Sequence, residues 1–274
     1  MTTALRPLGL GELLDRSFFL YRKHFLLFVA IVALPHLILL AFQLLGVGFG
    51  MQAQGAFSAR YWLWLFPTFI LQWIVTAAAQ GATVIAVSRV HLDQPATISG
   101  AFAGVARRIP KLALIMIITG VGIFVGCILL LLPGILLALI LALVIPIAVL
   151  ENTGLVNSIA RSWVLTQGSW LRILVIYILY CFLLFTLIWL WEFPMFWALG
   201  IFTRNHAPGT WPLWSQIVFP VCSFLSLSLV TPLITIALSL TYYDQRIRKE
   251  GFDLQHMMSM LEPAPGGAAA ALPG

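Results

Sequence analysis

Six apolar stretches, each long enough to cross a lipid bilayer, constrain this chain more than any other feature of its sequence. A transmembrane helix needs about 20 mainly apolar residues. The predicted spans are 25–47, 62–87, 111–132, 134–150, 171–199 and 213–243. Lipid cannot satisfy the free hydrogen-bonding groups of an open sheet edge, so each span is expected to be a helix. We therefore predict an all-α fold, a polytopic membrane helical bundle with six transmembrane helices.

Charged residues make up 9% of the chain and hydrophobic residues 61%, whereas soluble domains contain about 25% charged residues. The predicted organisation is a cytoplasmic amphipathic segment (1–24), a six-span membrane domain (25–243) and a cytoplasmic tail (244–274). From about residue 263 the tail is mainly Pro, Gly and Ala and is expected to be disordered. The sequence contains no GxxxxGK, HExxH, GxSxG or CxxC motif, so it lacks the common signatures of soluble enzymes.

The Lys and Arg residues of the connecting segments are distributed very unevenly. One set of connections carries Arg6, Arg16, Arg22, Lys23, Arg89, Arg107, Arg108, Lys111, Arg161, Arg172, Arg246, Arg248 and Lys249, and the other set carries Arg60 and Arg204. In membrane proteins the connections rich in Lys and Arg lie on the cytoplasmic side. This asymmetry predicts that both chain termini are cytoplasmic.

The stretches that precede spans one, three and five are predicted to lie on the cytoplasmic membrane surface as amphipathic helices. In the first of them, Leu10, Leu13 and Leu14 recur at helical spacing. Residues 16–20 before span one align without a gap with residues 161–165 before span five. One interpretation is a threefold repeat of an interfacial helix followed by two spans. The other is that any loop before a span collects Arg and aromatic anchors.

Eight of the basic residues lie close to predicted span ends, and we call them the cationic collar. They are Arg16, Arg22, Lys23, Arg107, Arg108, Lys111, Arg161 and Arg172. A Lys or Arg at the level of anionic headgroups contributes about 1 kcal/mol of attraction. The collar is therefore a candidate site for anionic lipid, and the alternative is that these charges only determine topology.

Polar side chains within the spans form a second candidate group, because each is costly in lipid unless it is paired or hydrated. His36 and Gln72 are expected near the middle of spans one and two, where they either line a polar pocket or bond to each other or to a backbone carbonyl. Span six carries Ser228, Thr231, Thr235 and Ser239 on one helix face. That stripe either packs against neighbouring helices or lines a wet path.

The cysteines and glycines give weaker indications of sites or partners. Cys127, Cys181 and Cys222 all fall in apolar stretches, which predicts packing roles and neither a disulfide framework nor a metal site. No cofactor is expected. The Gly122-xxx-Gly126 spacing indicates close helix approach and leaves a homo-oligomer or a membrane protein partner open. Nucleic-acid binding is not expected, because the basic residues lie beside apolar runs and do not form a solvated face.

Three parts of the sequence together resemble bacterial proteins of the glycerophosphoryl diester phosphodiesterase membrane-domain family. They are LGLGELLDR at 8–16 with LYRKHF at 20–25, the stretch 146–151 leading to Arg161-Ser162-Trp163, and YYDQRIRKEGFDL at 242–254. The family takes its name from members that carry a phosphodiesterase barrel. Such a barrel needs about 250 residues, and only a short tail follows span six, so no phosphodiesterase activity is carried over. The resemblance implies a stand-alone protein of the bacterial inner membrane.

These observations lead to two functional hypotheses. The first is a non-enzymatic integral membrane protein whose cationic collar engages anionic lipid headgroups or a membrane partner. The alternative is a transporter or channel for a small or amphiphilic substrate, with His36, Gln72 and the polar stripe of span six along the path. An intramembrane enzyme is disfavoured because the spans supply almost no convergent acids, bases or nucleophiles.

Overall fold

The protein is described by a computed structural model that covers residues 8–49, 59–204 and 212–251. Within these ranges the chain forms helices and turns and no strand. Six helical stretches of the described residues are long and apolar enough to cross a membrane, which confirms the predicted all-α membrane fold. The prediction of disorder from about residue 263 falls outside the described residues.

The helices follow the predicted spans with some changes at their ends. They are α1 (Leu10–Lys23), α2 (Phe25–Gly48), α3 (Ala59–His91), α4 (Ile98–Val105), the short 3-10 helix η1 (Ala106–Arg108), α5 (Ile109–Leu129), α6 (Leu131–Ile140), α7 (Val144–Leu150), α8 (Leu155–Thr166), α9 (Trp170–Arg204) and α10 (Leu213–Glu250). The fourth predicted span is divided between α6 and α7 by a turn at 141–143. The last helix continues to Glu250, so residues 244–250 extend α10.

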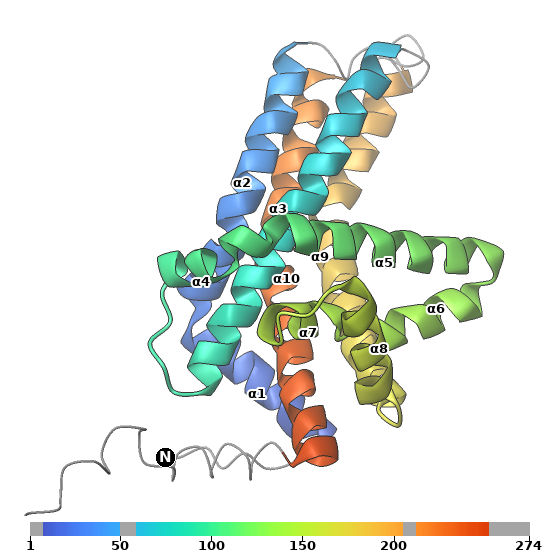
Figure 1. Cartoon of the computed structure of the whole chain (residues 1–274). Coiled ribbons are helices and arrows are strands. Elements are labelled where there is room, and N and C mark those ends of the chain that lie inside the picture. Colours follow the sequence, from blue (N-terminus) through green and yellow to red (C-terminus); the bar gives the residue numbers. More distant parts are fainter. Residues whose placement is uncertain (1–7, 50–58, 205–211, 252–274) are drawn as a thin grey trace, which may run out of the picture.

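Four long helices, α2, α3, α9 and α10, run side by side and form the upper part of the molecule (Figure 1). Helix α10 packs against α2, α3 and α9, and α2 packs against α3. The main core joins buried side chains of α1, α2, α3, α5 and α10, among others. Within it, α3 meets α5 at Gly81. A Cβ at Gly81 would lie 2.6 Å from Val105 Cγ2 and 2.9 Å from Leu112 Cδ1, so the absence of a side chain there lets the two helices come close.

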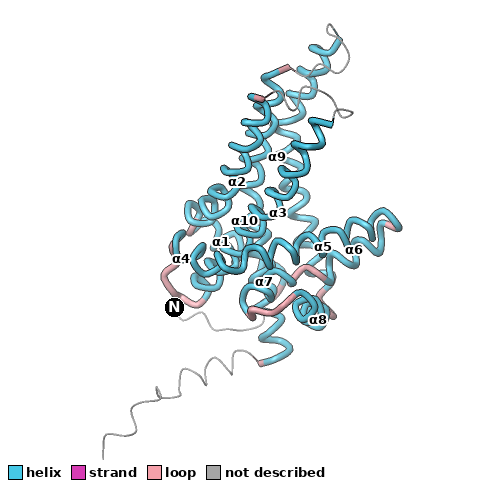
Figure 2. The backbone as a smooth tube through the Cα atoms, turned by 45° about the horizontal axis from the view of Figure 1, so that its top comes forward, coloured by secondary structure: helices cyan, strands magenta, loops and turns pink. Residues whose placement is uncertain are grey.

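Helices α5 and α6 form a hairpin that lies across the four long helices (Figure 1, Figure 2). The chain reverses at Leu130, which has an extended backbone, and not at Pro133, the residue between the predicted third and fourth spans. Pro133 lies instead in the first turn of α6, where its missing N–H would have no partner in the helix. A Cβ at Gly134 would lie 2.7 Å from Cys127 Cα. Glycine therefore permits the close contact between the two arms.

The tip of this hairpin is apolar. The side chains of Leu129, Leu130, Leu131 and Leu132 are each at least 68% exposed. Leucine side chains are favourable against acyl chains and unfavourable in water. Hydrocarbon is therefore the expected surrounding of the tip.

A short helix precedes each odd-numbered predicted span, namely α1, α4 and α8. Helices α1 and α8 bury equivalent residues of the alignment between the first and third units. Leu13, Ser17 and Leu20 are buried in α1, and the aligned Ser158, Ser162 and Leu165 are buried in α8. The middle unit begins with the shorter α4 and its hairpin crosses the bundle, so the first and third units resemble each other more than the second.

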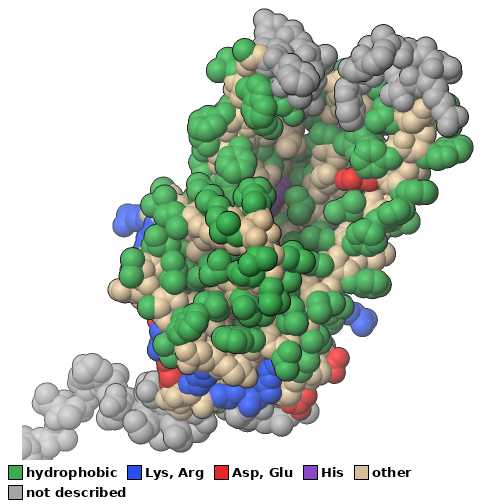
Figure 3. All heavy atoms as spheres, turned by 90° about the vertical axis from the view of Figure 1, so that its right-hand side faces the viewer, with side chains coloured by type: hydrophobic (Ala, Val, Ile, Leu, Met, Phe, Trp, Pro, Cys, Tyr) green, Lys and Arg blue, Asp and Glu red, His purple; other side chains and the backbone are tan. Residues whose placement is uncertain are grey.

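Charged side chains gather at the lower edge of the face shown in Figure 3, and apolar side chains cover most of the rest. We call the end of the molecule formed by α1, α7, α8 and the last turns of α10 the basic end. Its helices carry four of the eight residues of the cationic collar, Arg16, Arg22, Lys23 and Arg161.

Candidate functional site

Helix α1 is held against the bundle by one face. Its first turn is closed by the Glu12 carboxylate, which accepts a hydrogen bond of 3.0 Å from the Gly9 backbone N–H. On the buried face, the Ser17 hydroxyl donates to the Leu13 carbonyl at 2.7 Å. The Tyr21 hydroxyl donates to the Leu229 carbonyl of α10 at 2.7 Å. Burial raises the pKa of Tyr21 to about 12, so this hydroxyl stays protonated and keeps its bond.

The opposite face of α1 combines cations with exposed aromatic rings. We call Phe18, Phe19, Arg22 and Lys23 the α1 patch, and with Asp15 they line a depression on the surface. Phe19 is 62% exposed, and Lys23 Nζ lies 6.0 Å from the centre of its ring. Within the described part of the chain, Arg22 has no ion pair or hydrogen bond from its side chain. The patch places positive charge beside apolar surface, the arrangement of an interfacial helix.

Arg16 lies on the same helix but is less exposed than Arg22. It is half-buried, and this burial lowers the pKa of its guanidinium, while the negative charge of Asp93 acts in the opposite direction. An arginine remains charged despite such a shift. Arg16 therefore interacts electrostatically with the loop after α3 and is less accessible to lipid than Arg22.

Two collar residues at the start of α5 bind backbone carbonyls. Arg108 Nη1 donates to the Val149 carbonyl at 2.8 Å, and Lys111 Nζ donates to the Asn152 carbonyl at 3.4 Å. Both carbonyls lie at or just after the end of α7, where a cation is favoured by the helix dipole. Arg107, in contrast, is exposed and has no hydrogen bond or ion pair among the described residues.

Arg161 belongs to a network at the basic end. Its guanidinium pairs with Glu151 at 3.4 Å and with Glu250. The Tyr242 hydroxyl donates to Glu151 at 3.0 Å, and Arg246 pairs with Glu250 at 3.1 Å. These contacts join the end of α10 to α8 and to the turn after α7.

Arg172 belongs to a second network, centred on Asp244. The Asp244 carboxylate is 2% exposed, and it accepts from Arg172 Nη1 at 3.1 Å, from Arg248 Nε at 2.9 Å and from the Leu8 backbone N–H at 2.7 Å. Both arginines also donate to the Leu8 carbonyl. The network ties α9, α10 and the segment before α1 together.

Seven of the eight collar residues therefore divide into two groups, and the half-buried Arg16 belongs to neither. Arg108, Lys111, Arg161 and Arg172 bind groups of the protein itself, whereas Arg22, Lys23 and Arg107 are exposed. Sequence reasoning missed the acids that pair with Arg161 and Arg172, namely Glu151, Glu250 and Asp244. The available signal was their position in stretches that carried the family resemblance, together with the scarcity of acids elsewhere in the chain.

The two polar residues expected at mid-membrane bond within their own helices. His36 Nδ1 lies 2.8 Å from the Val32 carbonyl, one turn away in the segment interrupted by Pro35. Gln72 Nε2 donates to Thr76 Oγ1 at 2.9 Å. His36 and Gln72 thus satisfy local groups and do not pair with each other.

The polar stripe of α10 is also mainly bonded internally. The Thr235 hydroxyl donates to the Thr231 carbonyl at 3.0 Å, and the Ser239 hydroxyl donates to the Thr235 carbonyl at 2.6 Å. Ser228 is buried, and its hydroxyl has no partner among the described residues. Most of the stripe therefore contributes to helix packing.

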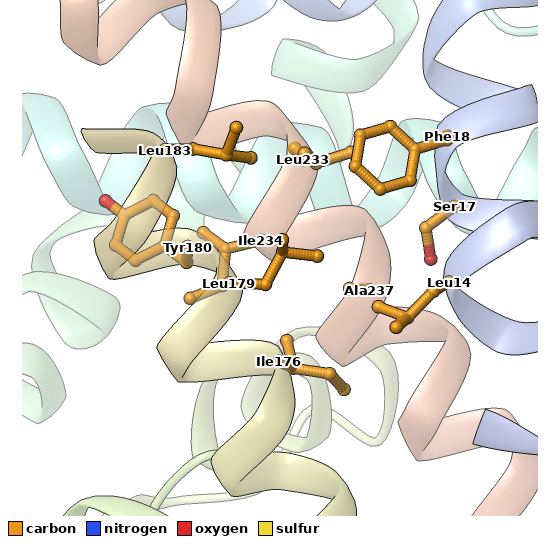
Figure 4. A pocket seen from close by; sticks show the side chains of 10 residues that line it. All are labelled: Leu14, Ser17, Phe18, Ile176, Leu179, Tyr180, Leu183, Leu233, Ile234 and Ala237. Atoms are coloured by element: carbon orange, nitrogen blue, oxygen red, sulfur yellow. The ribbon is translucent and has the colours of Figure 1, made fainter. Parts of the chain in front are cut away.

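Two of the cavities between the helices differ in size and lining. Figure 4 shows the first, where α1 meets α9 and α10, with Phe18, Ile176 and Leu233 among its walls. Its volume is about 10 Å³, which is close to the smallest space that holds one water. The second cavity, about 280 Å³, lies between the α5–α6 hairpin, α7 and the long helices α3, α9 and α10.

The described residues contain no cluster of three or more His, Cys, Asp or Glu side chains placed to hold a metal ion. Comparisons with known proteins add no further assignment: no protein-family model matches the chain, and neither a curated protein nor a solved structure matches it.

Proposed function

We propose that this chain is a non-enzymatic protein of the bacterial inner membrane, with both termini in the cytoplasm, that binds anionic lipid headgroups through the α1 patch and Arg107. One observation carries the proposal. The exposed cations Arg22, Lys23 and Arg107 have no ion pair within the described residues, whereas four other collar residues are bonded internally.

Energetics favour a lipid surface as the partner of these cations. Each exposed Lys or Arg at the surface of an anionic leaflet contributes about 1 kcal/mol. Phe18 and Phe19 beside Arg22 and Lys23 are 37% and 62% exposed, and aromatic side chains are favourable at the headgroup level. The same helix thus offers both interactions that hold an interfacial helix on a membrane.

Transport along His36, Gln72 and the α10 stripe receives less support, because most of these side chains bond to groups on their own helices. Membership of the glycerophosphoryl diester phosphodiesterase membrane-domain family is also part of our proposal. It rests on the sequence resemblance at both ends of the chain alone. No family model matches the chain.

The test measures lipid preference of the purified full-length protein. The wild type and a triple variant, Arg22→Gln, Lys23→Gln and Arg107→Gln, are reconstituted in vesicles with equal phosphatidylglycerol and phosphatidylcholine, and the lipids retained by each are counted by native mass spectrometry. The triple variant is expected to lose at least about tenfold in preference for phosphatidylglycerol, since the three charges together supply about 3 kcal/mol. High salt is expected to weaken the wild-type preference.

A matched control neutralises Arg60 and Arg204, the basic residues that the charge asymmetry places on the opposite side. This control variant should keep the wild-type preference. An unchanged preference in the triple variant would refute the proposal, as would an equal loss in the control.

A further inference from the structure

The larger cavity arises because the α5–α6 hairpin crosses the bundle. Helix α5 meets α3 with Gly120 under the Trp73 ring, where an added Cβ would lie 2.6 Å from Trp73 Cη2. The return arm places Ala138 and Ala142 on the other wall. Small side chains at these three positions leave a volume of about 280 Å³, far more than the roughly 10–15 Å³ that one water needs.

The walls of the cavity are uncharged and mainly apolar, with a few polar groups. Gln80 of α3 and Tyr177 of α9 border the cavity, and no hydrogen bond from either side chain is formed within the described part of the chain. A donor that has left water without gaining a partner is unfavourable. A ligand with an acceptor oxygen would give these two side chains a partner.

Lipid is the molecule most readily available to this cavity. The cavity is partly open, and the helices that border it expose apolar side chains, among them Phe124 of α5, Leu136 of α6 and Ile178 of α9. In a membrane these surfaces contact acyl chains. A charged, water-soluble molecule would have to leave water and find no opposite charge inside, which is unfavourable.

We propose that the cavity between the α5–α6 hairpin and helices α3, α9 and α10 binds one acyl chain of a glycerolipid, with the ester carbonyl accepting a hydrogen bond from the Tyr177 hydroxyl. The apolar walls contact the methylene groups, and Gln80 provides a further polar contact near the ester. The site includes none of Arg22, Lys23 and Arg107, so this proposal is independent of lipid binding at the α1 patch.

The experiment uses the full-length protein in nanodiscs with phosphatidylcholine that carries a diazirine on one acyl chain. After irradiation, crosslinked residues are mapped by mass spectrometry. The expected result is enrichment of crosslinks at cavity-lining residues such as Met116, Ala138 and Tyr177 over equally apolar residues on the outer surface. Crosslinks spread evenly over the outer surface, without enrichment in the cavity, would overturn the proposal.

Two variants test the geometry and one serves as a control. Ala138→Phe fills the cavity and should abolish the enrichment, while Ala160→Phe, on the exposed side of α8, should leave it unchanged. Tyr177→Phe keeps the ring and removes the hydroxyl donor, and should lower crosslinking in the cavity about threefold or more, as expected for one lost hydrogen bond. If Ala138→Phe does not fold, unchanged crosslinking in Tyr177→Phe still refutes the proposed binding mode.

A diazirine fatty acid serves as a second probe, because a free fatty acid has an acyl chain and acceptor oxygens as a glycerolipid does. Cavity crosslinking by the fatty acid without crosslinking by the phospholipid would overturn the glycerolipid assignment. The triple variant at Arg22, Lys23 and Arg107 should crosslink in the cavity as the wild type does, which keeps a failure of the lipid-headgroup proposal distinct from a failure of this one.

Discussion

Asp244 is the residue whose replacement tests the architecture of the basic end most directly. Its carboxylate is 2% exposed and accepts from Arg172, from Arg248 and from the Leu8 backbone N–H. Replacement by alanine leaves two arginines without their shared acid and one backbone donor without its acceptor. The perturbation therefore acts on three parts of the chain at once.

The size of the effect follows from the exposure of the partners. Removing one member of a fully buried ion pair costs about 3–5 kcal/mol. The side chains of Arg172 and Arg248 are 31% and 32% exposed, so water compensates for part of the loss. We expect Asp244→Ala to lower the free energy of unfolding by about 2–4 kcal/mol. For a chain of this size, that corresponds to a fall in Tm of about 5–10 °C.

The assay is thermal unfolding of the purified variants in one detergent or nanodisc composition. Asp15→Ala is the matched control, because Asp15 is exposed on α1 and its loss should change Tm by no more than about 2 °C. Asp244→Asn should give an intermediate value, since the amide oxygen still accepts but carries no charge. A Tm for Asp244→Ala equal to that of the control would refute this account of the network.

Two further predictions concern the α5–α6 hairpin. Gly134→Ala should destabilise the protein by about 1–3 kcal/mol, because the new Cβ would overlap the backbone of Cys127. The control is Gly122→Ala, which should be neutral in the same thermal assay because a Cβ there would meet nothing within 4 Å. In a cysteine-free background, Leu130→Cys should resist a membrane-impermeant maleimide added to either side, since the apolar tip lies in hydrocarbon, while Asn157→Cys on the exposed side of α8 should react from one side. Labelling of Leu130→Cys from the side opposite Asn157→Cys would show that the tip reaches water.

The helical class and the approximate positions of the spans could be predicted because they depend on local properties. A run of apolar residues such as 25–47 has few alternatives to a helix in lipid, and α2 begins at the predicted residue. The equivalence of α1 and α8 was also visible in the alignment of 16–20 with 161–165. In both cases the prediction depends only on residues that are close to one another in the sequence.

The division of the collar could not be predicted from residue types. Arg22 and Arg172 are both arginines beside an apolar run, yet Arg172 reaches Asp244, which is far away in the sequence. Whether a basic side chain is free for lipid depends on which acids and carbonyls the fold brings within reach. The same holds for His36 and Gln72, which were expected at a similar depth but form their hydrogen bonds within their own helices.

The sequence alone determined that this is an all-α protein with six helices able to cross a membrane, because the bilayer makes apolar length and backbone hydrogen bonding decisive. Only the tertiary structure decided that the α5–α6 hairpin crosses the bundle, that a cavity of about 280 Å³ remains beside it and that part of the collar is used internally. These features depend on contacts between residues distant in the chain, such as Trp73 with Gly120. Hydropathy and spacing do not contain that information.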